Sequence, residues 1–107
     1  MAAARGRAFW IVRGTDVWLV RRPPKGMLGG MRALPDDEWN ARGDGDGQGA
    51  GEVLGMVRHG FTHFDLELLV VAGDSATGEG EWWPLDRIEE AGLPTLLAKA
   101  ARLALAV

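Results

Sequence analysis

The sequence contains no cysteine, and this absence excludes several kinds of site at once. Without thiols the chain can form no disulfide, no thiolate-ligated zinc site and no cysteine-ligated iron–sulfur cluster of its own. The absence agrees with a reducing compartment. The sequence also lacks an apolar run long enough to span a membrane, and its first residues lack the apolar stretch of a signal peptide.

Few residues could serve as nucleophiles or metal ligands. Ser75 is the single serine, and no recognisable motif places a histidine beside it, so serine-based covalent catalysis is not expected. His59, His63 and Asp65 are close enough in sequence for a metal site, but no second ligand cluster supports one. Either histidine could instead bond a backbone carbonyl in the core. Glycine and aspartate alternate over residues 43–51, which is a weak signal for a calcium loop.

The formal net charge of −3 argues against general binding of polyanions by the whole domain. The charge is unevenly distributed, however. Residues 1–32 carry seven Arg and Lys against one Asp, whereas residues 33–55 carry six Asp and Glu against one Arg. The basic first part could face phosphates or could be a solvated hairpin surface, and the sequence leaves both alternatives open.

A chain of 107 residues, 47% of them hydrophobic, suits one domain with one core, residues 1–107. The pattern predicts an α+β, or layered α/β, fold with a mixed, mostly antiparallel sheet and a C-terminal helix packed on it. The expected strands are residues 8–13, 17–22, 32–35, 53–57, 65–72 and 81–85, and the expected helix is residues 94–106. The buried face of this helix should hold Leu96, Leu97, Ala100, Leu103, Ala104 and Val107.

Residue types also predict local details. Gly60 predicts a bend or bulge, and Pro84 predicts that the last strand lies on an edge of the sheet. Asp36 is expected to cap a helical turn that continues to Trp39. Residues 23–31, rich in proline and glycine, should form a loop whose leucine and methionine side chains are buried.

Residues 58–64, Arg-His-Gly-Phe-Thr-His-Phe, are the most informative segment. They place two imidazoles, two phenyl rings and a hydroxyl just before an apolar run. A hydroxyl and an imidazole at the entry to a strand can bind the polar edge of a flat ligand, and a phenyl ring can stack on it or anchor the loop. This combination suits a nucleobase better than a phosphate, for which backbone amides and cations would be expected.

Residues 89–93, Glu-Glu-Ala-Gly-Leu, match the end of the Nudix signature of nucleoside-diphosphate hydrolases, Gly-x5-Glu-x7-Arg-Glu-U-x-Glu-Glu-x-Gly-U. The rest of the signature fails. Its first glycine, upstream glutamate, arginine and next glutamate are replaced by Val71, Thr77, Leu85 and Asp86. This alignment therefore lacks the carboxylates that would hold magnesium, and the two glutamates are expected on a solvated helix face.

Three segments, in order along nearly the whole chain, form a family pattern. Residues 22–35 contain Arg-Pro-Pro-Lys-Gly-Met-Leu-Gly-Gly-Met and then Leu-Pro, residues 59–64 read His-Gly-Phe-Thr-His-Phe, and residues 81–100 contain Trp-Trp-Pro-Leu, Leu-Pro-Thr and Lys-Ala. This set resembles the C-terminal domain of A/G-specific adenine DNA glycosylases, the MutY family, including its His-x-Phe-Ser/Thr-His-Phe motif. Each segment is weak alone, but the ordered set is specific.

The resemblance implies a Nudix-like fold that has lost pyrophosphatase chemistry. It implies that the chain is non-catalytic by itself and recognises 8-oxoguanine opposite adenine in double-stranded DNA, while an N-terminal catalytic domain of the same enzyme excises the adenine. That other domain carries the family's 4Fe-4S cluster, and no cofactor or metal is expected in this chain. A cytoplasmic bacterial protein that acts at the nucleoid, without a membrane, is implied as well.

The chemistry of the lesion gives the motif residues their expected roles. Oxidation at C8 adds a carbonyl oxygen and turns N7 from an acceptor into an N–H donor, so a reader must offer an acceptor near N7. A threonine hydroxyl can accept or donate, and the resemblance places the family's lesion-reading serine or threonine at Thr62. His63 is expected at the lesion, and Phe61 is expected to shape the loop or wedge against the base. The expected contacts to the DNA backbone are Arg22, Lys25 and His59.

Two rival functions stay open. The chain could be a divergent Nudix hydrolase of oxidised nucleotides, in which case it would release pyrophosphate in a magnesium-dependent reaction. It could also be a protein-interaction module that only recruits partners, in which case Thr62 and His63 would not affect lesion discrimination.

Overall fold

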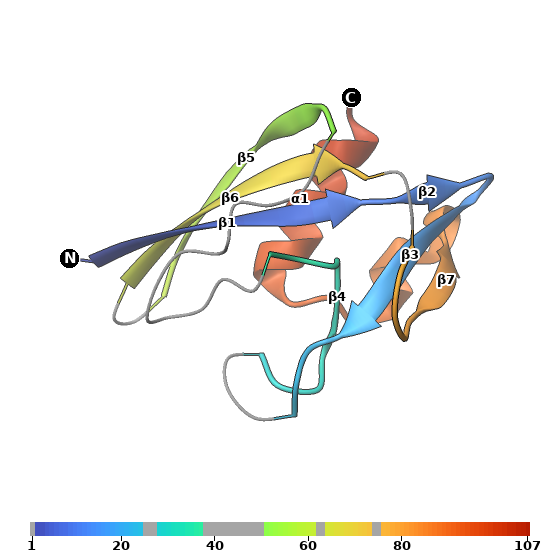
Figure 1. The fold of residues 1–107 in the computed structure, drawn as a ribbon, viewed down its shortest axis with the longest axis horizontal. Coiled ribbons are helices and arrows are strands. Elements are labelled where there is room, and N and C mark those ends of the chain that lie inside the picture. The colour runs from blue at the N-terminus through green and yellow to red at the C-terminus, as the bar shows by residue number, and fades with distance from the viewer. Residues whose placement is uncertain (1, 25–27, 38–50, 62–63, 74–75) are drawn as a thin grey trace.

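The computed structural model describes residues 2–24, 28–37, 51–61, 64–73 and 76–107. Within these residues the chain forms two β-sheets, a short 3₁₀ helix and a C-terminal α-helix (Figure 1). Five strand pairs are present in this part of the chain, and four of them are antiparallel. The expected mixed, mostly antiparallel α+β fold is confirmed.

The larger sheet contains β1 (Ala2–Trp10), β6 (Phe64–Ala72) and β5 (Val53–Gly60), in that order. β1 runs parallel to β6, and β5 runs antiparallel to β6 (Figure 1). β1 begins well before the expected strand 8–13. Residues 2–7 are alanine, arginine and glycine, which carry little strand propensity, but they pair with the strongly apolar β6 along its whole length.

The smaller sheet is built around β3 (Asp16–Arg21). In the described residues β3 pairs antiparallel with β2 (Val12–Arg13), β4 (Arg32–Ala33) and β7 (Glu81–Pro84). The predicted hairpin is confirmed at its turn, where Gly14 adopts a φ of 61°. Its first strand divides at Ile11, so that Trp10 belongs to the larger sheet and Val12 to the smaller one. Within the described part of the chain β7 pairs with β3 alone, so it is the edge strand that Pro84 predicts.

Two predictions about backbone shape are wrong. Gly60 is not bulged: its register with Asp65 continues that of the preceding residues, and the irregularity lies between Val53 and Gly55. Asp36 does not show the conformation of a helical turn but forms an antiparallel β-bridge with Ala8. The rest of the expected turn lies outside the described residues. Long-range pairing with β1 has replaced the local structure that the acidic run suggested.

Two predictions about burial are also wrong. Leu28 packs against the core as expected, but Met31 is 38% exposed. The Met31 carbonyl accepts a hydrogen bond from the Arg22 N–H, so the backbone there is held without burial of the side chain. Val107 is 77% exposed, because the helix ends before it reaches that position. Met27 lies outside the described residues.

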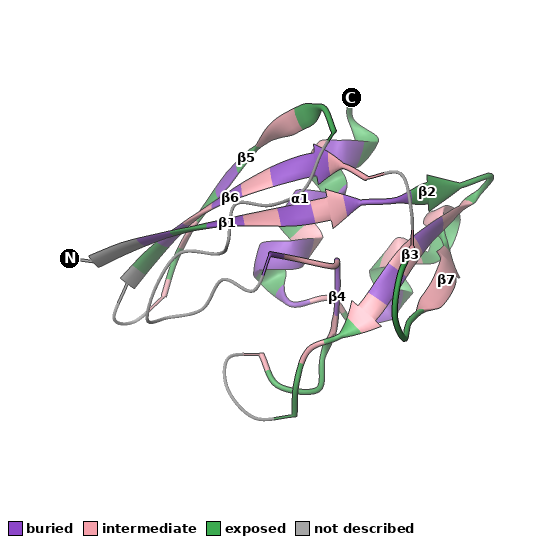
Figure 2. Cartoon of the chain, in the orientation of Figure 1, coloured by how far each residue is buried: buried purple, intermediate pink, exposed green. Residues whose placement is uncertain are grey.

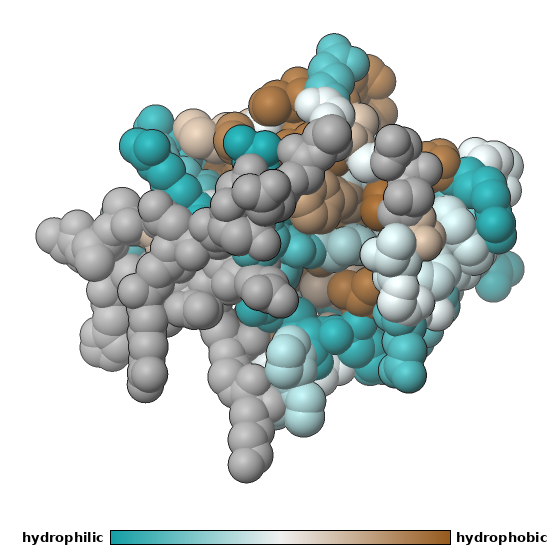
Figure 3. All heavy atoms as spheres, in the orientation of Figure 1, coloured by the Kyte–Doolittle hydropathy of each residue, from teal (hydrophilic) through white to brown (hydrophobic). Residues whose placement is uncertain are grey.

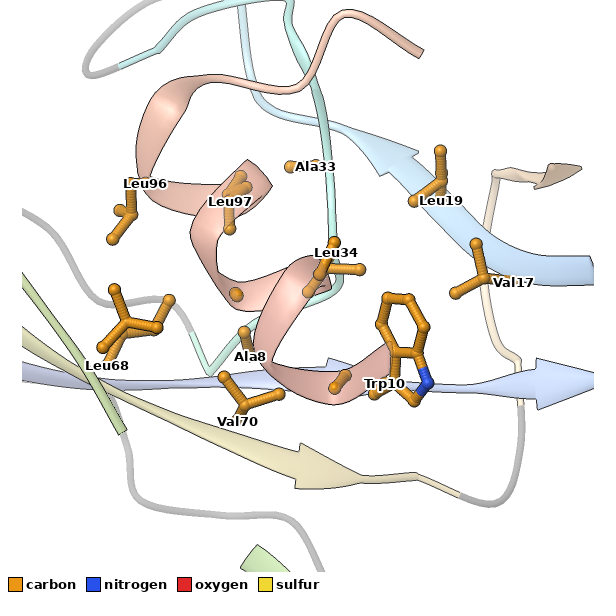
Figure 4. Close-up of a cluster of buried hydrophobic side chains, with 14 of the residues drawn as sticks. Ala8, Trp10, Val17, Leu19, Ala33, Leu34, Leu68, Val70, Leu96 and Leu97 are labelled. Carbon is orange, nitrogen blue, oxygen red and sulfur yellow. The ribbon is translucent and has the colours of Figure 1, made fainter. Parts of the chain in front are cut away.

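The C-terminal helix α1 (Thr95–Leu105) follows the 3₁₀ helix η1 (Leu85–Ala91), and Gly92 with a φ of 72° separates them. α1 packs mainly on β5. Its buried residues are Leu96, Leu97, Ala100, Ala101 and Ala104, and Lys99 and Arg102 are exposed. Figure 2 shows buried and exposed stretches alternating along this helix. Side chains of β1, β3, β6 and α1 point toward one another in the core, among them Trp10, Leu19 and Leu97 (Figure 4).

The surface is uneven in polarity. On the face drawn in Figure 3, hydrophobic residues gather at the top of the view, where β5 begins and α1 ends, and hydrophilic residues dominate the lower part. Val53, Met56, Leu105 and Val107 are among the exposed large hydrophobic residues. No helix in the described part of the chain is both long and apolar enough to cross a membrane.

Candidate nucleic-acid interface

The candidate motif lies where β5 ends and the neighbouring strand β6 begins. Arg58, His59 and Gly60 are the last residues of β5, opposite Glu67, Leu66 and Asp65 of β6. Phe61 follows β5 directly, while Thr62 and His63 lie outside the described residues. The structure therefore describes the residues that precede Thr62 and His63. The expected lesion contacts of Thr62 and His63 stay predictions.

His59 is directed toward the C-terminal helix. Alternate residues of a strand share one face, and Val57, two residues earlier, is buried with 7% exposure. On that face His59 Nδ1 lies 3.3 Å from the ammonium Nζ of Lys99 on α1. The His59 ring also contacts the Phe61 ring edge to face, with centroids 4.8 Å apart and planes at 69°. His59 thus joins the helix to the segment that follows β5.

The contact with Lys99 fixes the hydrogen-bonding roles of His59. An ammonium group has three donors and no acceptor, so His59 Nδ1 must accept the hydrogen bond. The neutral ring then carries its proton on Nε2, which is a donor. His59 therefore presents an N–H at the end of β5, as a contact to a phosphate or to a carbonyl oxygen would require.

An open hollow of about 460 Å³ lies beside the motif. It is lined by Arg58, His59, Gly60, Asp65, Leu66 and Glu67. Gly60 allows the Asp65 carboxylate to lie close to the backbone of β5, because a side-chain Cβ at this position would lie 3.2 Å from Asp65 Oδ1. A substituted residue would push the Asp65 carboxylate away.

The charged groups of the hollow are partly paired. The Nε atoms of Arg58 and Arg5 each lie 3.4 Å from a carboxylate oxygen of Glu67, so two cations share one anion. Both arginine side chains are more than 70% exposed, and such pairs contribute little to stability. With the Asp65 carboxylate, which also lines the hollow, the two arginines are matched in number by two carboxylates.

The expected backbone contacts at Arg22 and Lys25 have different positions. Arg22 is mostly buried, with 10% of its side chain exposed, and its Nη1 pairs with Asp36 Oδ2. That pair connects the residue after β3 to the segment after β4, so Arg22 has a structural role. Lys25 lies outside the described residues.

Sequence reasoning missed Lys99 as a neighbour of the motif, since no local pattern connects residues 40 positions apart.

No metal centre is formed by the part of the chain that the structure describes, where no group of three His, Cys, Asp or Glu residues could hold an ion. Glu89 and Glu90, the remnant of the Nudix signature, are exposed on η1 as expected. The signature is also missing from the full sequence, because no arginine in the chain is followed by glutamate. His63 and residues 43–51, which the metal and calcium alternatives need, lie outside the described residues.

Solved structures share this architecture. A MutT Nudix hydrolase from Burkholderia pseudomallei is 20% identical, with coverage of 99% of this chain and 98% of that chain and a TM-score of 0.63. The MutT protein from Methanosarcina mazei Go1 is 16% identical, with 98% and 95% coverage and a TM-score of 0.69. The C-terminal domain of mouse MUTYH, solved in complex with human PCNA, is 17% identical, with 95% and 87% coverage and a TM-score of 0.63. These identities show a common fold.

No curated protein sequence matches this chain. The family model of the NUDIX domain, in contrast, matches residues 7–103, which is nearly the whole length. The chain therefore belongs to the Nudix domain family.

Proposed function

We propose that this chain is the lesion-recognition domain of an A/G-specific adenine glycosylase, which reads 8-oxoguanine opposite adenine in DNA. The observation that carries the proposal is the His-Gly-Phe-Thr-His-Phe segment at the end of two paired strands, beside an open hollow. The likeness of the fold to the C-terminal domain of mouse MUTYH supports it. The catalytic domain would belong to the same bacterial enzyme, acting at the nucleoid in the cytoplasm.

The recognition chemistry follows from the lesion. Guanine presents a lone pair at N7, whereas 8-oxoguanine presents an N–H there and a carbonyl oxygen at C8. The Thr62 hydroxyl would accept the hydrogen bond from N7–H, and a neighbouring backbone N–H or a donor such as His63 would meet the new oxygen. Phe61, which packs partly on the core, would hold the connection between β5 and β6 in place or wedge against the base.

The hydrolase alternative has the weaker support. Nudix hydrolases of known fold are as similar to this chain as the MUTYH domain is, so fold alone does not separate the two functions. The sequence does separate them, because without the Arg-Glu pair of the signature the magnesium-binding helix cannot be assembled. Magnesium-dependent release of pyrophosphate from 8-oxo-dGTP by this chain would reverse this conclusion.

The test is adenine excision by the whole enzyme from duplexes with 8-oxoguanine or guanine opposite adenine. Replacing Thr62→Ala should lower the preference for the lesion about fivefold to tenfold, the value of one hydrogen bond, and Thr62→Ser should restore it. Thr77→Ala is the matched control, since Thr77 is exposed in the loop before β7. An unchanged preference in Thr62→Ala would favour the protein-interaction alternative.

The isolated chain should bind the lesion duplex weakly or not measurably. Its net charge of −3 gives little general attraction to DNA, and the catalytic domain would supply the rest of the contact. Fluorescence anisotropy at physiological salt measures this directly, and nanomolar affinity would contradict the expectation.

A further inference from the structure

Lys99 reaches across from α1 to the end of β5, and only one of its donors is used there. Its ammonium group carries three N–H donors, and the contact with His59 Nδ1 occupies one. Lys99 is exposed, and among the described residues no carboxylate lies within ion-pair distance of it. Within the residues that the structure describes, two donors of Lys99 and the Nε2–H of His59 therefore have no partner.

The nearby acidic residues belong to the other face of the sheet. Asp65 and Glu67 pair with Gly60 and Arg58, whereas His59 pairs with Leu66, which is fully buried. Neighbouring residues along a strand point to opposite faces, so the two carboxylates are directed away from the face where His59 meets Lys99. Positive charge on that face is thus not neutralised within the described residues. A ligand that satisfies the two remaining donors of the Lys99 ammonium should be an anion with several acceptor oxygens.

We infer that Lys99, held at the end of β5 by His59, is the site for one phosphate of the DNA backbone, next to the nucleotide that the β5–β6 connection reads. The inference rests on the proposed function for the identity of the phosphate. Lys99 supplies the charge and the donors, and its bond to His59 Nδ1 holds the ammonium at the end of β5. The Nε2–H lies on the other edge of the ring and is not a donor to this phosphate. A phosphate held there would fix the register of the DNA strand relative to Phe61, which the His59 ring contacts.

The anion site can be tested on this chain without DNA. At a pH at which the His59 ring is neutral, nitrogen-15 NMR of the side chain should show the proton on Nε2. Titration with inorganic phosphate at constant ionic strength should shift the His59 ring signals and the Lys99 Nζ signal, and Lys99→Met should abolish the shift. Arg87→Met is the matched control, because Arg87 is a cation with 70% side-chain exposure on η1. A ring protonated on Nδ1, or no response to phosphate, would overturn the site.

The DNA arm uses the whole enzyme with lesion-containing and undamaged duplexes. Loss of one phosphate contact in Lys99→Met should weaken both complexes by the same factor, about eightfold at 0.1 M salt, and lower the salt slope by about 1. Arg87→Met should change neither. Equal affinity of Lys99→Met and the parent enzyme for both duplexes would refute the phosphate contact.

The two arms separate failure of the inference from failure of the proposed function. Suppose that the chain binds phosphate beside His59 but that the enzyme shows no preference for the lesion. The anion site is then supported and the proposed recognition of the lesion is refuted. Suppose instead that Thr62→Ala lowers the preference for the lesion but that the signals of His59 and Lys99 do not respond to phosphate. The proposed recognition of the lesion is then supported and the anion site is refuted.

Discussion

Two regions of the molecule combine a cation with an aromatic ring. They differ in how many of the hydrogen-bonding groups are bonded to other groups of the chain. In the first, the Arg32 cluster, Arg32 Nε bonds Glu81 at 3.0 Å, its Nη1 bonds the Ala91 carbonyl at 3.2 Å, and its guanidinium lies 4.5 Å from the Trp83 ring centroid. In the second, the His59 cluster, Lys99 bonds His59, whose ring contacts Phe61. The first cluster connects β4, β7 and η1, whereas the second has donors without a partner among the residues that the structure describes.

The difference shows what marks a binding site in a small domain. Residue type does not, since both clusters have a cation and a ring. What separates them is whether the hydrogen-bonding groups are already satisfied by the chain itself. The Trp83 indole N–H is also satisfied, by the Arg87 carbonyl at 2.7 Å. The comparison therefore predicts that changes in the Arg32 cluster affect stability and changes in the His59 cluster affect binding.

The largest effect on stability is expected for Arg32→Ala, which should lower the free energy of unfolding by about 2 kcal/mol. The substitution leaves the carbonyl of Ala91, a residue only 2% exposed, without its donor and removes the cation from the Trp83 ring. Urea denaturation followed by tryptophan fluorescence measures the loss.

Two variants sharpen this measurement. Arg21→Ala on the neighbouring strand removes an exposed arginine with one bond, to the Gly30 carbonyl, and should cost less than about 0.5 kcal/mol. Arg32→Lys keeps the charge but loses the planar fork, so it should recover little of the stability. Equal losses for Arg21→Ala and Arg32→Ala would remove the distinction between a closed cluster and a solvated side chain.

A smaller effect, about 1 kcal/mol, is expected for Trp83→Phe. The ring that faces Arg32 remains, but the indole N–H that bonds the Arg87 carbonyl is lost. Trp82→Phe is the matched control on the same strand, because in the described residues its indole N–H makes no hydrogen bond. The same denaturation assay compares the two variants, and a Trp82→Phe loss as large as that of Trp83→Phe would show that ring size, not the hydrogen bond, stabilises β7.

The sequence predicts well those features that local patterns encode. The hairpin turn at Gly14, the edge strand with Pro84 and the apolar face of α1 all follow from residues close together in the chain. Each depends on a φ preference, a missing donor or a helical period, which short segments determine. For the same reason the motif at residues 58–64 could be found without the fold.

Features that depend on distant partners could not be predicted. Residues 2–7 of β1 lack strand formers and are held by parallel pairing with β6. Asp36 joins Ala8 across 28 positions instead of starting a helical turn. The bond between Lys99 and His59 likewise needs α1 to lie on β5, which local sequence does not specify. The contact between Lys99 and His59 at the candidate site could therefore be identified only from the fold.

Phe61→Leu should reduce the free energy of unfolding by only about 0.5 kcal/mol, because the apolar bulk remains and the edge-to-face contact with His59 is lost. In the whole enzyme, Phe61→Leu should lower the preference for the lesion by more than this loss of stability accounts for. Phe9→Leu, at another half-buried phenylalanine of the large sheet, is the control. It should cost similar stability and leave lesion preference unchanged, so parallel behaviour of the two variants would argue against a role for Phe61 in reading the base.

The smallest effect on stability is expected for Lys99→Met, within about 0.5 kcal/mol of the parent chain. Water can replace the ammonium at His59 Nδ1, since both side chains are accessible, and methionine keeps the aliphatic stem on the helix. The measurement is the same urea denaturation, with Arg32→Ala beside it. A loss near that of Arg32→Ala would mean that Lys99 holds α1 on β5 as Arg32 holds β7 on η1. The two clusters would then be equal structural ties, and any weaker DNA binding of Lys99→Met could be assigned to a loosened helix and not to a missing phosphate contact.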